Sequence, residues 1–349
     1  MRGWLRLIAF AIAVFLLIFT FVNASWLASR PLGGVRLIAH RGVSQLFDHE
    51  GVERDTCTAD RIEPPVHDYL ENTVRSMQAA RQMGADIVEI DIAPTKDGRI
   101  AIFHDWKVDC RTNGKGPIRD KTMAELKQLD PGYGYTADHG KSFPFRGRQI
   151  GTIPTLEEAV NALPSTPIIF NFKGKDPSEA DQLAAALKAA RRDVVARKDI
   201  FYGAPGPIER IRTIYPAAWA WSKESAKSCT KDYVKFGWTS IVPESCRNGI
   251  LIVPLNRQWA FWGWPNRTIQ RMDKVGARVL IVGPYGDDLP MGLTLPEQLG
   301  EIPSTFKGYV WVDDIWTVGP ALRSNRDIRT REQQDAATAG LKRRREATN

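Results

Sequence analysis

Eight short runs rich in β-branched and aromatic residues recur along the chain, and segments of helical character separate them. Strands that alternate with helices form parallel sheets, and eight such units fit a closed (β/α)8 barrel. The sequence therefore predicts an α/β fold of the TIM-barrel class, as one domain over residues 35–322. The expected strands are 35–39, 87–92, 168–173, 200–203, 217–222, 250–254, 278–282 and 308–313, and the expected helices are 72–83, 155–163, 178–192, 207–213 and 266–275.

The N-terminal segment differs from the rest because residues 7–22 are apolar except for Thr20. This run is slightly longer than a signal-peptide core of ~7–15 residues and slightly shorter than a membrane span of ~20. Ala24 ends a small-residue cleavage pattern, whereas extension to Ala28 would complete a span. Residues 1–30 are therefore predicted to be a signal peptide or a membrane anchor. Either one exports the remainder, to a periplasmic or extracellular face.

Four cysteines in an exported chain favour disulfides, and none has the CxxC spacing of a zinc or redox site. Three pairings are possible. We favour Cys57–Cys110 and Cys229–Cys246, because each pair falls on neighbouring loops of the expected barrel. Buried free thiols are the alternative.

The formal net charge of +8 comes partly from the C-terminal segment, which contains a Lys-Arg-Arg-Arg block. Residues 323–349 show little apolar periodicity, so they are predicted to form a disordered basic tail. No nucleic-acid-binding motif accompanies the charge, and an exported protein rarely meets nucleic acid. Anionic lipid head groups or phosphate-containing substrates are the expected partners.

Charged residues end the first two expected strands, where barrel enzymes place catalytic groups. His40 and Arg41 follow the first strand, and Glu89 and Asp91 lie in the second. Side chains alternate along a strand, so these two carboxylates share a face. Two inward carboxylates repel each other unless a cation lies between them, and a hard divalent metal is the natural one. A solvated strand face is the alternative.

A second histidine follows a turn signal, Asp97-Gly98, between two apolar runs. A two-residue turn pairs Lys96 with Arg99 and places His104 opposite Asp91. Histidines can act as a base and an acid around a phosphate, one deprotonating the nucleophile and the other protonating the leaving alkoxide. A metal and a nearby guanidinium would stabilise the developing negative charge.

Successive motifs between residues 40 and 163 resemble those of the glycerophosphodiester phosphodiesterase family. The resemblance implies a TIM barrel, a Mg²⁺ or Ca²⁺ ion on Glu89 and Asp91, and hydrolysis of a glycerophosphodiester to glycerol phosphate and an alcohol. The motifs are His40-Arg41-Gly42, Glu71-Asn72-Thr73, Glu89-x-Asp91, Thr95-Lys96-Asp97-Gly98, His104-Asp105, Cys110-Arg111-Thr112-Asn113-Gly114, Thr122-x3-Leu126-x2-Leu129 and Ile153-Pro154-Thr155-Leu156-Glu157-Glu158.

The resemblance also implies roles for individual residues. His40 and His104 form the acid/base pair, and Arg41 contacts the phosphate. Lys173 is a second candidate for the phosphate, while Glu71 and Asp105 lie in supporting positions.

Three features depart from the family pattern. The third strand carries Asn171 where the family has a glutamate that completes the metal site, so the amide would bind metal more weakly. Residues 43–70 form a long insertion, predicted to be a lid that Cys57–Cys110 would hold; a decorative loop is the alternative. Trp316-Thr317-Val318 falls after the last strand, so Trp311 is preferred as the pocket aromatic.

An aromatic cluster follows the sixth strand, with Trp259, Trp262 and Trp264 close together in sequence. Core packing is one interpretation, and an interfacial patch beside phospholipid is the other.

The leading hypothesis is thus an exported glycerophosphodiester hydrolase. Phospholipase D-like action on lysophospholipid or sphingolipid is an alternative, and Asn171 motivates a third, an inactive phosphodiester-binding barrel.

Overall fold

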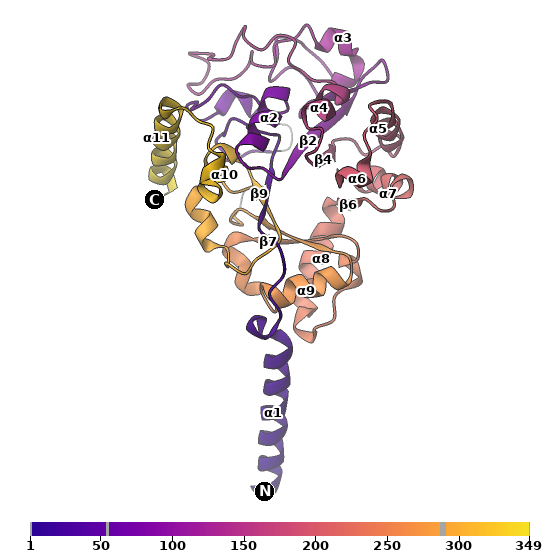
Figure 1. Ribbon diagram of the computed structural model, residues 1–349, viewed down its shortest axis with the longest axis vertical. Coiled ribbons are helices and arrows are strands. Elements are labelled where there is room, and N and C mark those ends of the chain that lie inside the picture. The colour runs from indigo at the N-terminus through magenta and orange to yellow at the C-terminus, as the bar shows by residue number, and fades with distance from the viewer. Residues whose placement is uncertain (1, 54–55, 287–290, 349) are drawn as a thin grey trace.

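Eight parallel strands form one sheet in the computed structural model, which describes residues 2–53, 56–286 and 291–348 (Figure 1). The sheet order is β6-β5-β4-β2-β1-β9-β8-β7, and the short β3 pairs antiparallel with β2. All eight predicted strands are confirmed. Their bounds are β1 Arg36–Ala39, β2 Ile87–Pro94, β3 Ile100–Ile102, β4 Ile168–Phe172, β5 Ile200–Gly203, β6 Trp219–Ser222, β7 Ile250–Pro254, β8 Arg278–Val282 and β9 Tyr309–Val312.

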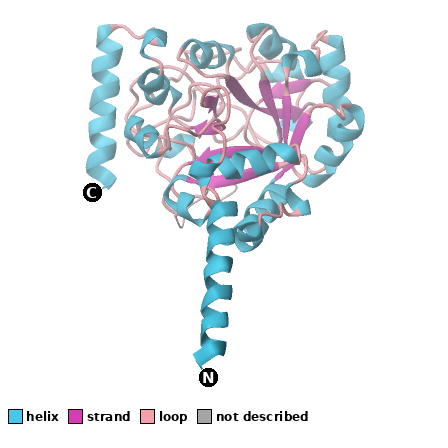
Figure 2. Cartoon of the chain, turned by 60° about the horizontal axis from the view of Figure 1, so that its bottom comes forward, coloured by secondary structure: helices cyan, strands magenta, loops and turns pink. Residues whose placement is uncertain are grey.

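The sheet curls into a nearly closed barrel surrounded by helices, so the predicted TIM-barrel class is confirmed (Figure 2). Within the described residues no strand ladder joins β6 to β7. A side chain bridges this seam instead, because Trp219 Nε1 donates to Gly249 O at 3.0 Å.

Two apolar layers stabilise the barrel. Inside, Ile38, Ile87, Ile169 and Ile200 pack with Trp221 below the charged ends of the strands. Outside, the opposite faces of the same strands pack against the helices in a larger cluster. A parallel strand buried on both faces is apolar at nearly every position, which explains the continuous apolar runs in the sequence.

The helices are α1 Arg2–Asn23, α2 Val74–Gln82, α3 Met123–Leu126, α4 Leu156–Ala162, α5 Ser178–Ala189, α6 Val194–Arg197, α7 Pro205–Ile214, α8 Lys223–Phe236, α9 Asn266–Lys274, α10 Ile315–Leu322 and α11 Arg331–Thr348. The five predicted helices match α2, α4, α5, α7 and α9. Thr73 and Thr155 begin α2 and α4 with capping boxes that satisfy free backbone N–H groups.

The prediction of a disordered C-terminal tail is wrong, because residues 331–348 form α11. Ala337 and Gly340 lie buried on one face of the helix. Arg344 on the same face forms ion pairs with Asp314 at 2.8 Å and Glu63 at 3.3 Å. Small residues and ion pairs therefore dock a segment that lacks an apolar stripe.

The turn between β2 and β3 differs from the predicted two-residue hairpin. Thr95 pairs with Arg99, since Thr95 N donates to Arg99 O at 2.9 Å. The loop therefore has three residues, and Gly98 supplies the positive φ of 73° that such a loop requires. The register shifts by one, so Phe103 N bonds Asp91 O at 3.0 Å and the residue opposite Asp91 is not His104.

Both favoured disulfides are present. Cys57 is bonded to Cys110, and Cys229 is bonded to Cys246. The first joins the 43–70 insertion to the loop after His104, and the second joins α8 to the loop before β7.

Candidate active site

Strand register places polar side chains in one row above the apolar interior of the barrel. Asp91 of β2 pairs with Asn171 of β4, which pairs with Tyr202 of β5, which pairs with Trp221 of β6. Glu89 lies two residues before Asp91 and therefore faces the same interior. The end of β2 thus supplies two buried carboxylates to the mouth of the barrel.

The chain turns sharply after β1, and this turn carries the first histidine. His40 Nδ1 lies 2.7 Å from Asp313 Oδ1, at the end of β9. Arg41 has a φ of 61°, a strained conformation for a side-chain-bearing residue. That conformation lets Arg41 N donate to Glu89 Oε2 at 3.0 Å, while Arg41 Nε donates to His40 Nε2 at 3.1 Å.

Asp91 is surrounded by donors. Asn72 Nδ2 donates to Oδ2 and Asn171 Nδ2 donates to Oδ1, each at 2.9 Å. Lys173 Nζ lies 3.6 Å from Oδ1, and Arg41 Nε lies 3.4 Å from Oδ2. Burial opposes ionisation, but these cations outweigh it and lower the pKa of Asp91 below its usual range.

Glu89 has the opposite electrostatic environment. Its Oε1 is buried without a hydrogen-bond partner. Burial, and then repulsion by Asp91, raise the pKa of Glu89 to about 7. An unsatisfied buried carboxylate oxygen is costly unless a cation or proton occupies the space beside it.

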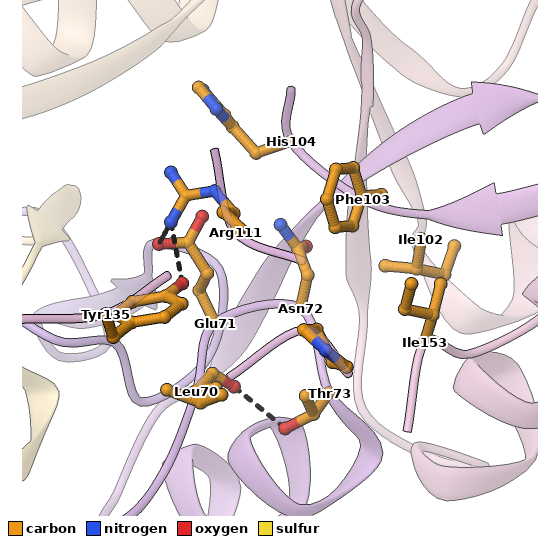
Figure 3. A pocket seen from close by; sticks show the side chains of 11 residues that line it. Leu70, Glu71, Asn72, Thr73, Ile102, Phe103, His104, Arg111, Tyr135 and Ile153 are labelled. Atoms are coloured by element: carbon orange, nitrogen blue, oxygen red, sulfur yellow. Dashed lines mark hydrogen bonds and ion pairs between the residues drawn. The ribbon is translucent and has the colours of Figure 1, made fainter. Parts of the chain in front are cut away.

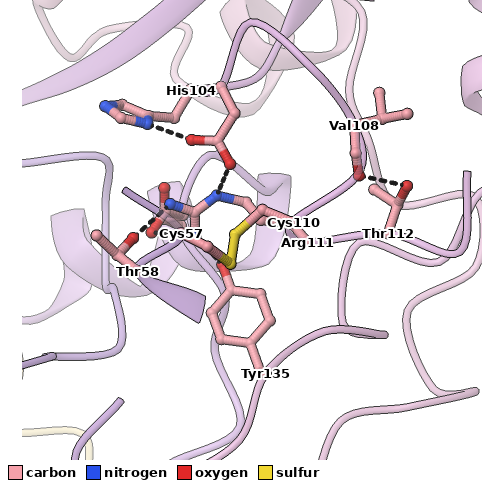
Figure 4. The surroundings of a disulfide bond; sticks show 10 residues. Cys57, Thr58, His104, Val108, Cys110, Arg111, Thr112 and Tyr135 are labelled. Carbon is pink, nitrogen blue, oxygen red and sulfur yellow. Dashed lines mark hydrogen bonds and ion pairs between the residues drawn. A yellow bond between two sulfur atoms is a disulfide. The ribbon is translucent and has the colours of Figure 1, made fainter. Parts of the chain in front are cut away.

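The second histidine is held by its neighbour. His104 Nδ1 lies 2.6 Å from Asp105 Oδ1, and Arg111 Nε donates to Asp105 Oδ2 at 2.9 Å (Figure 4). Burial, reinforced by the charge of Arg41, lowers the pKa of His104 well below its usual value of 6.5. His104 is therefore neutral at pH 7.

Arg111 links the insertion to the site. Its Nη1 donates to Glu71 Oε2 at 3.2 Å and to Tyr135 Oη at 2.6 Å, beside a small pocket that His104 also lines (Figure 3). Its Nη2 donates to Thr58 Oγ1 at 2.8 Å, next to the disulfide-bonded Cys57. Glu71 in turn accepts from Arg41 Nη1 at 3.0 Å.

The structure thus brings together the residues singled out from sequence. One network of hydrogen bonds and ion pairs contains His40, Arg41, Glu71, Glu89, Asp91, Asn171 and Lys173. Arg111 links His104 and Asp105 to this network. The ring of Trp311 lies 5.2 Å from the ring of His40. The His49 and Phe47 rings lie 4.2 Å apart at a tilt of 32°. Burial opposes ionisation of Asp313, but His40 and, to a smaller extent, His49 lower its pKa.

Sequence reasoning gave no role to three residues that matter here. Asp313 holds His40, Asn72 holds Asp91, and Arg111 holds both Asp105 and Glu71. Asp313 directly follows β9 as His40 directly follows β1, so the positional rule that selected His40 could have selected Asp313. Arg111 follows no strand, and nothing in its sequence context indicates a link to Glu71.

A family model described as the glycerophosphoryl diester phosphodiesterase family matches residues 40–218. This segment spans half of the chain and contains both histidines and both carboxylates of the site. The chain belongs to this family.

Curated relatives of the glycerophosphodiester phosphodiesterase family support this assignment. A putative glycerophosphodiester phosphodiesterase of Bacillus subtilis, YhdW, is 41% identical over 153 residues, which is 42% of this chain and 57% of that protein. A glycerophosphodiester phosphodiesterase of Caldanaerobacter subterraneus is 34% identical over 123 residues, 34% of this chain and 47% of that protein. The chain thus spans about half the length of these relatives.

Solved structures of the family share the fold. The glycerophosphodiester phosphodiesterase of Agrobacterium tumefaciens superposes with a TM-score of 0.54 at 20% identity, covering 82% of this chain and 99% of that chain. A phosphodiesterase of Oleispira antarctica, solved with the product sn-glycerol-3-phosphate, gives a TM-score of 0.51 at 21% identity, covering 82% and 96%.

The described residues of the site offer few charged ligands for a hard cation. In the described part of the chain, no group of three or more His, Cys, Asp or Glu residues could hold a metal. Glu89 Oε1 lacks a partner and is an oxygen donor of the kind that Mg²⁺ and Ca²⁺ prefer, whereas the oxygens of Asp91 already accept from Asn72 and Asn171.

The aromatic cluster after β7 divides into two parts. Phe261 is buried and Trp264 packs against Phe306 at 5.3 Å, as the core interpretation predicted. Trp262 instead meets Phe19 of α1 edge-on at 5.7 Å, and Trp259 is exposed.

Proposed function

We propose that the chain hydrolyses glycerophosphodiesters to glycerol phosphate and an alcohol, with His40 and His104 as the acid/base pair. One observation carries the proposal: two imidazoles, each fixed by a carboxylate through Nδ1, adjoin the same buried carboxylate pair. These contacts leave Nε2 as the reacting nitrogen of each ring, and His40 Nε2 accepts from Arg41 Nε in this structure.

His104 is suited to accept the first proton. Its lowered pKa keeps it neutral at pH 7, so it can take the proton of the attacking water or substrate hydroxyl. His40 supplies a proton to the leaving alkoxide from its doubly protonated form, in which Nδ1 faces Asp313 and Nε2–H replaces the hydrogen bond accepted from Arg41 Nε in this structure. Arg41 and Lys173 lie beside Asp91 and provide fixed positive charge for the phosphate oxygens.

A divalent metal completes the proposal. Glu89, Asp91 and Asn171 would hold it, and it would supply Lewis-acid stabilisation of the phosphate. Mg²⁺ and Ca²⁺ are the expected ions because all three ligands are oxygen donors.

The test is release of glycerol phosphate from glycerophosphocholine by the full chain in detergent micelles. We expect turnover that EDTA abolishes and Mg²⁺ or Ca²⁺ restores. His40→Ala and His104→Ala should each lower kcat by about 10³-fold, within the range for lost acid/base catalysis. His139→Asn is the matched control, because His139 is an exposed loop histidine with a φ of 55° that asparagine tolerates.

The same assay separates the other functions. Choline release from lysophosphatidylcholine, without glycerol phosphate release, would favour a phospholipase D-like activity. Tight binding of glycerophosphocholine without turnover, unchanged in the His→Ala variants, would favour an inactive binding barrel.

A further inference from the structure

The end of α1 is built into the barrel by polar contacts. Arg271 of α9 donates from Nη2 to Val22 O at 2.8 Å and to Asn23 Oδ1 at 3.1 Å. Asn23 Nδ2 donates to Trp238 O at 2.9 Å. Ser25 Oγ accepts from Asn266 N at 3.0 Å. The contacts span both sides of the Ala24–Ser25 bond.

Arg271 makes this attachment energetically important. It is 5% exposed, and its other nitrogen donates to Gly237 O at 3.0 Å and Tyr233 Oη at 3.2 Å. The last carbonyls of a helix have no partner within the helix and carry partial negative charge, so a guanidinium stabilises them. Removal of residues 1–24 would leave this buried cation without two of its acceptors, which is costly.

The body of α1 has the properties of a membrane span. Gly3–Asn23 is the one helix in the described residues that is long and apolar enough to cross a membrane, and none of it is buried. In both ribbon views it projects away from the barrel (Figures 1 and 2).

Exposed apolar side chains surround the point where α1 leaves the barrel. We call them the collar. Trp238 lies in η4 Gly237–Thr239, which α1 contacts, and Trp26 lies in η1 Ser25–Leu27, which α9 contacts. Tryptophan and flanking lysine favour the head-group layer of a bilayer. The collar consists of Trp26, Leu27, Phe236, Trp238 and Ile241, exposed by 76%, 41%, 47%, 41% and 73%, with Lys235 Nζ 4.9 Å from the Phe236 ring.

We propose that α1 is retained as an uncleaved membrane anchor and that the collar rests on the head groups of the outer leaflet. The hydrogen bonds of Arg271 to Val22 and Asn23, and of Asn23 to Trp238, fix the angle between the anchor and the barrel. One face of the barrel therefore meets the lipid. The α3 end of the molecule, remote from α1 in Figure 1, then faces away from the bilayer. The inference does not depend on the proposed function.

Retention is tested by the intact mass of the full chain after export from a bacterial host. We expect the mass of the whole chain, in membranes, resistant to alkaline extraction. Val22→Ala is the positive control for cleavage, since it creates an Ala-Asn-Ala pattern before Ser25. A wild-type chain that starts near Ser25 and is recovered in the soluble fraction would overturn the anchor.

Docking of the collar is tested with an environment-sensitive fluorophore on the full chain in nanodiscs that contain phosphatidylglycerol and spin-labelled lipid. A probe on Ile241→Cys should be quenched at least twofold more than one on Ala124→Cys, an exposed site in α3. Equal quenching at the two sites would refute the docking surface. Asn23→Ala, which removes the hydrogen bond to Trp238, should reduce quenching at residue 241 while the chain stays in the membrane.

Discussion

The two sides of the barrel interior differ in chemistry. Arg41 follows β1, Glu89 and Asp91 lie in β2, and Asn171 lies in β4. Hydrogen bonds and ion pairs join these four residues. On β5, β6 and β9, which flank these strands in the sheet, the interior is aromatic, with successive ring contacts of 4.5–6.4 Å among Tyr202, Trp219, Trp221, Tyr309 and Trp311. The comparison teaches that one set of strands supplies the charged groups of the site and another set supplies the aromatic surface that shapes the pocket. Changes on the first side should alter chemistry, and changes on the second should alter substrate fit.

Asp313 joins the two sides, because it follows aromatic β9 but holds His40. Asp313→Asn should lower kcat by about 10²-fold with little change in KM, since loss of the carboxylate frees the imidazole to rotate or to adopt the other tautomer. The pH profile of kcat should shift as well. An effect on KM alone would show that Asp313 belongs with the aromatic side.

The raised pKa of Glu89 predicts that residues on the charged side make folding stability depend on pH. Its folded pKa of about 7 lies above the usual 4.5, so the folded state binds the extra proton between these values. Glu89 should therefore contribute a fall of about 3 kcal/mol in the stability of the metal-free chain as pH rises from 4.5 to 7, whereas His104, with its lowered pKa, contributes a rise over the same range. Urea unfolding at several pH values should give a pH slope that is more negative by this amount in the wild type than in Glu89→Gln, and this difference is the Glu89 slope.

Saturating Ca²⁺ should also remove the slope, because the ion stabilises the ionised carboxylate. Trp311→Phe, on the aromatic side, is the matched control and should keep the slope. Equal slopes in the wild type and in Glu89→Gln would show that Glu89 does not carry the effect.

Asn171→Glu restores the carboxylate that the family pattern has at this position. Added negative charge beside Asp91 should tighten Mg²⁺ or Ca²⁺ binding about 10-fold, without loss of activity. Calorimetric titration of the metal-free chain measures the affinity, and Asn171→Gln tests whether length rather than charge matters. A collapse in turnover would assign Asn171 a role of its own in this chain.

Trp311 should have the smallest effect. Trp311→Leu removes a ring beside His40 and Tyr202 and should raise KM by about 3- to 10-fold with kcat nearly unchanged, because aromatic contacts contribute roughly 1 kcal/mol. Trp259→Leu, at an exposed tryptophan outside this aromatic set, is the control. A loss confined to kcat would instead place Trp311 in the chemical step.

The sequence predicted most of the fold because each parallel strand is buried on both faces and is therefore marked by an apolar run. Residues close in sequence, such as His104 and Asp105, could be assigned together. The Asp313–His40 contact joins positions 273 residues apart, and no local pattern indicates it. The turn before β3 was misjudged because Thr95 Oγ1 accepts from Arg99 N at 3.1 Å and favours the three-residue loop.

Helix α11 was missed for a different reason. Composition predicts docking only where apolar residues repeat, whereas Ala337, Gly340 and Arg344 dock this helix through small contact residues and ion pairs. Their spacing of three and four residues is helical, but it carries no hydrophobic signal.

Arg111 constrains how the insertion can change. One guanidinium contacts Thr58 in the insertion, Asp105 behind His104 and Glu71 beside Arg41. Exchange of residues 43–70 for a loop of another length would therefore leave Arg111 Nη2 without its acceptor, Thr58. Arg111 is linked to the proposed base His104 through two hydrogen bonds, by way of Asp105. Loop grafts in this barrel should succeed only when the new segment also presents a hydroxyl or carbonyl to that guanidinium. The Arg111 contact therefore limits which sequences the insertion can have.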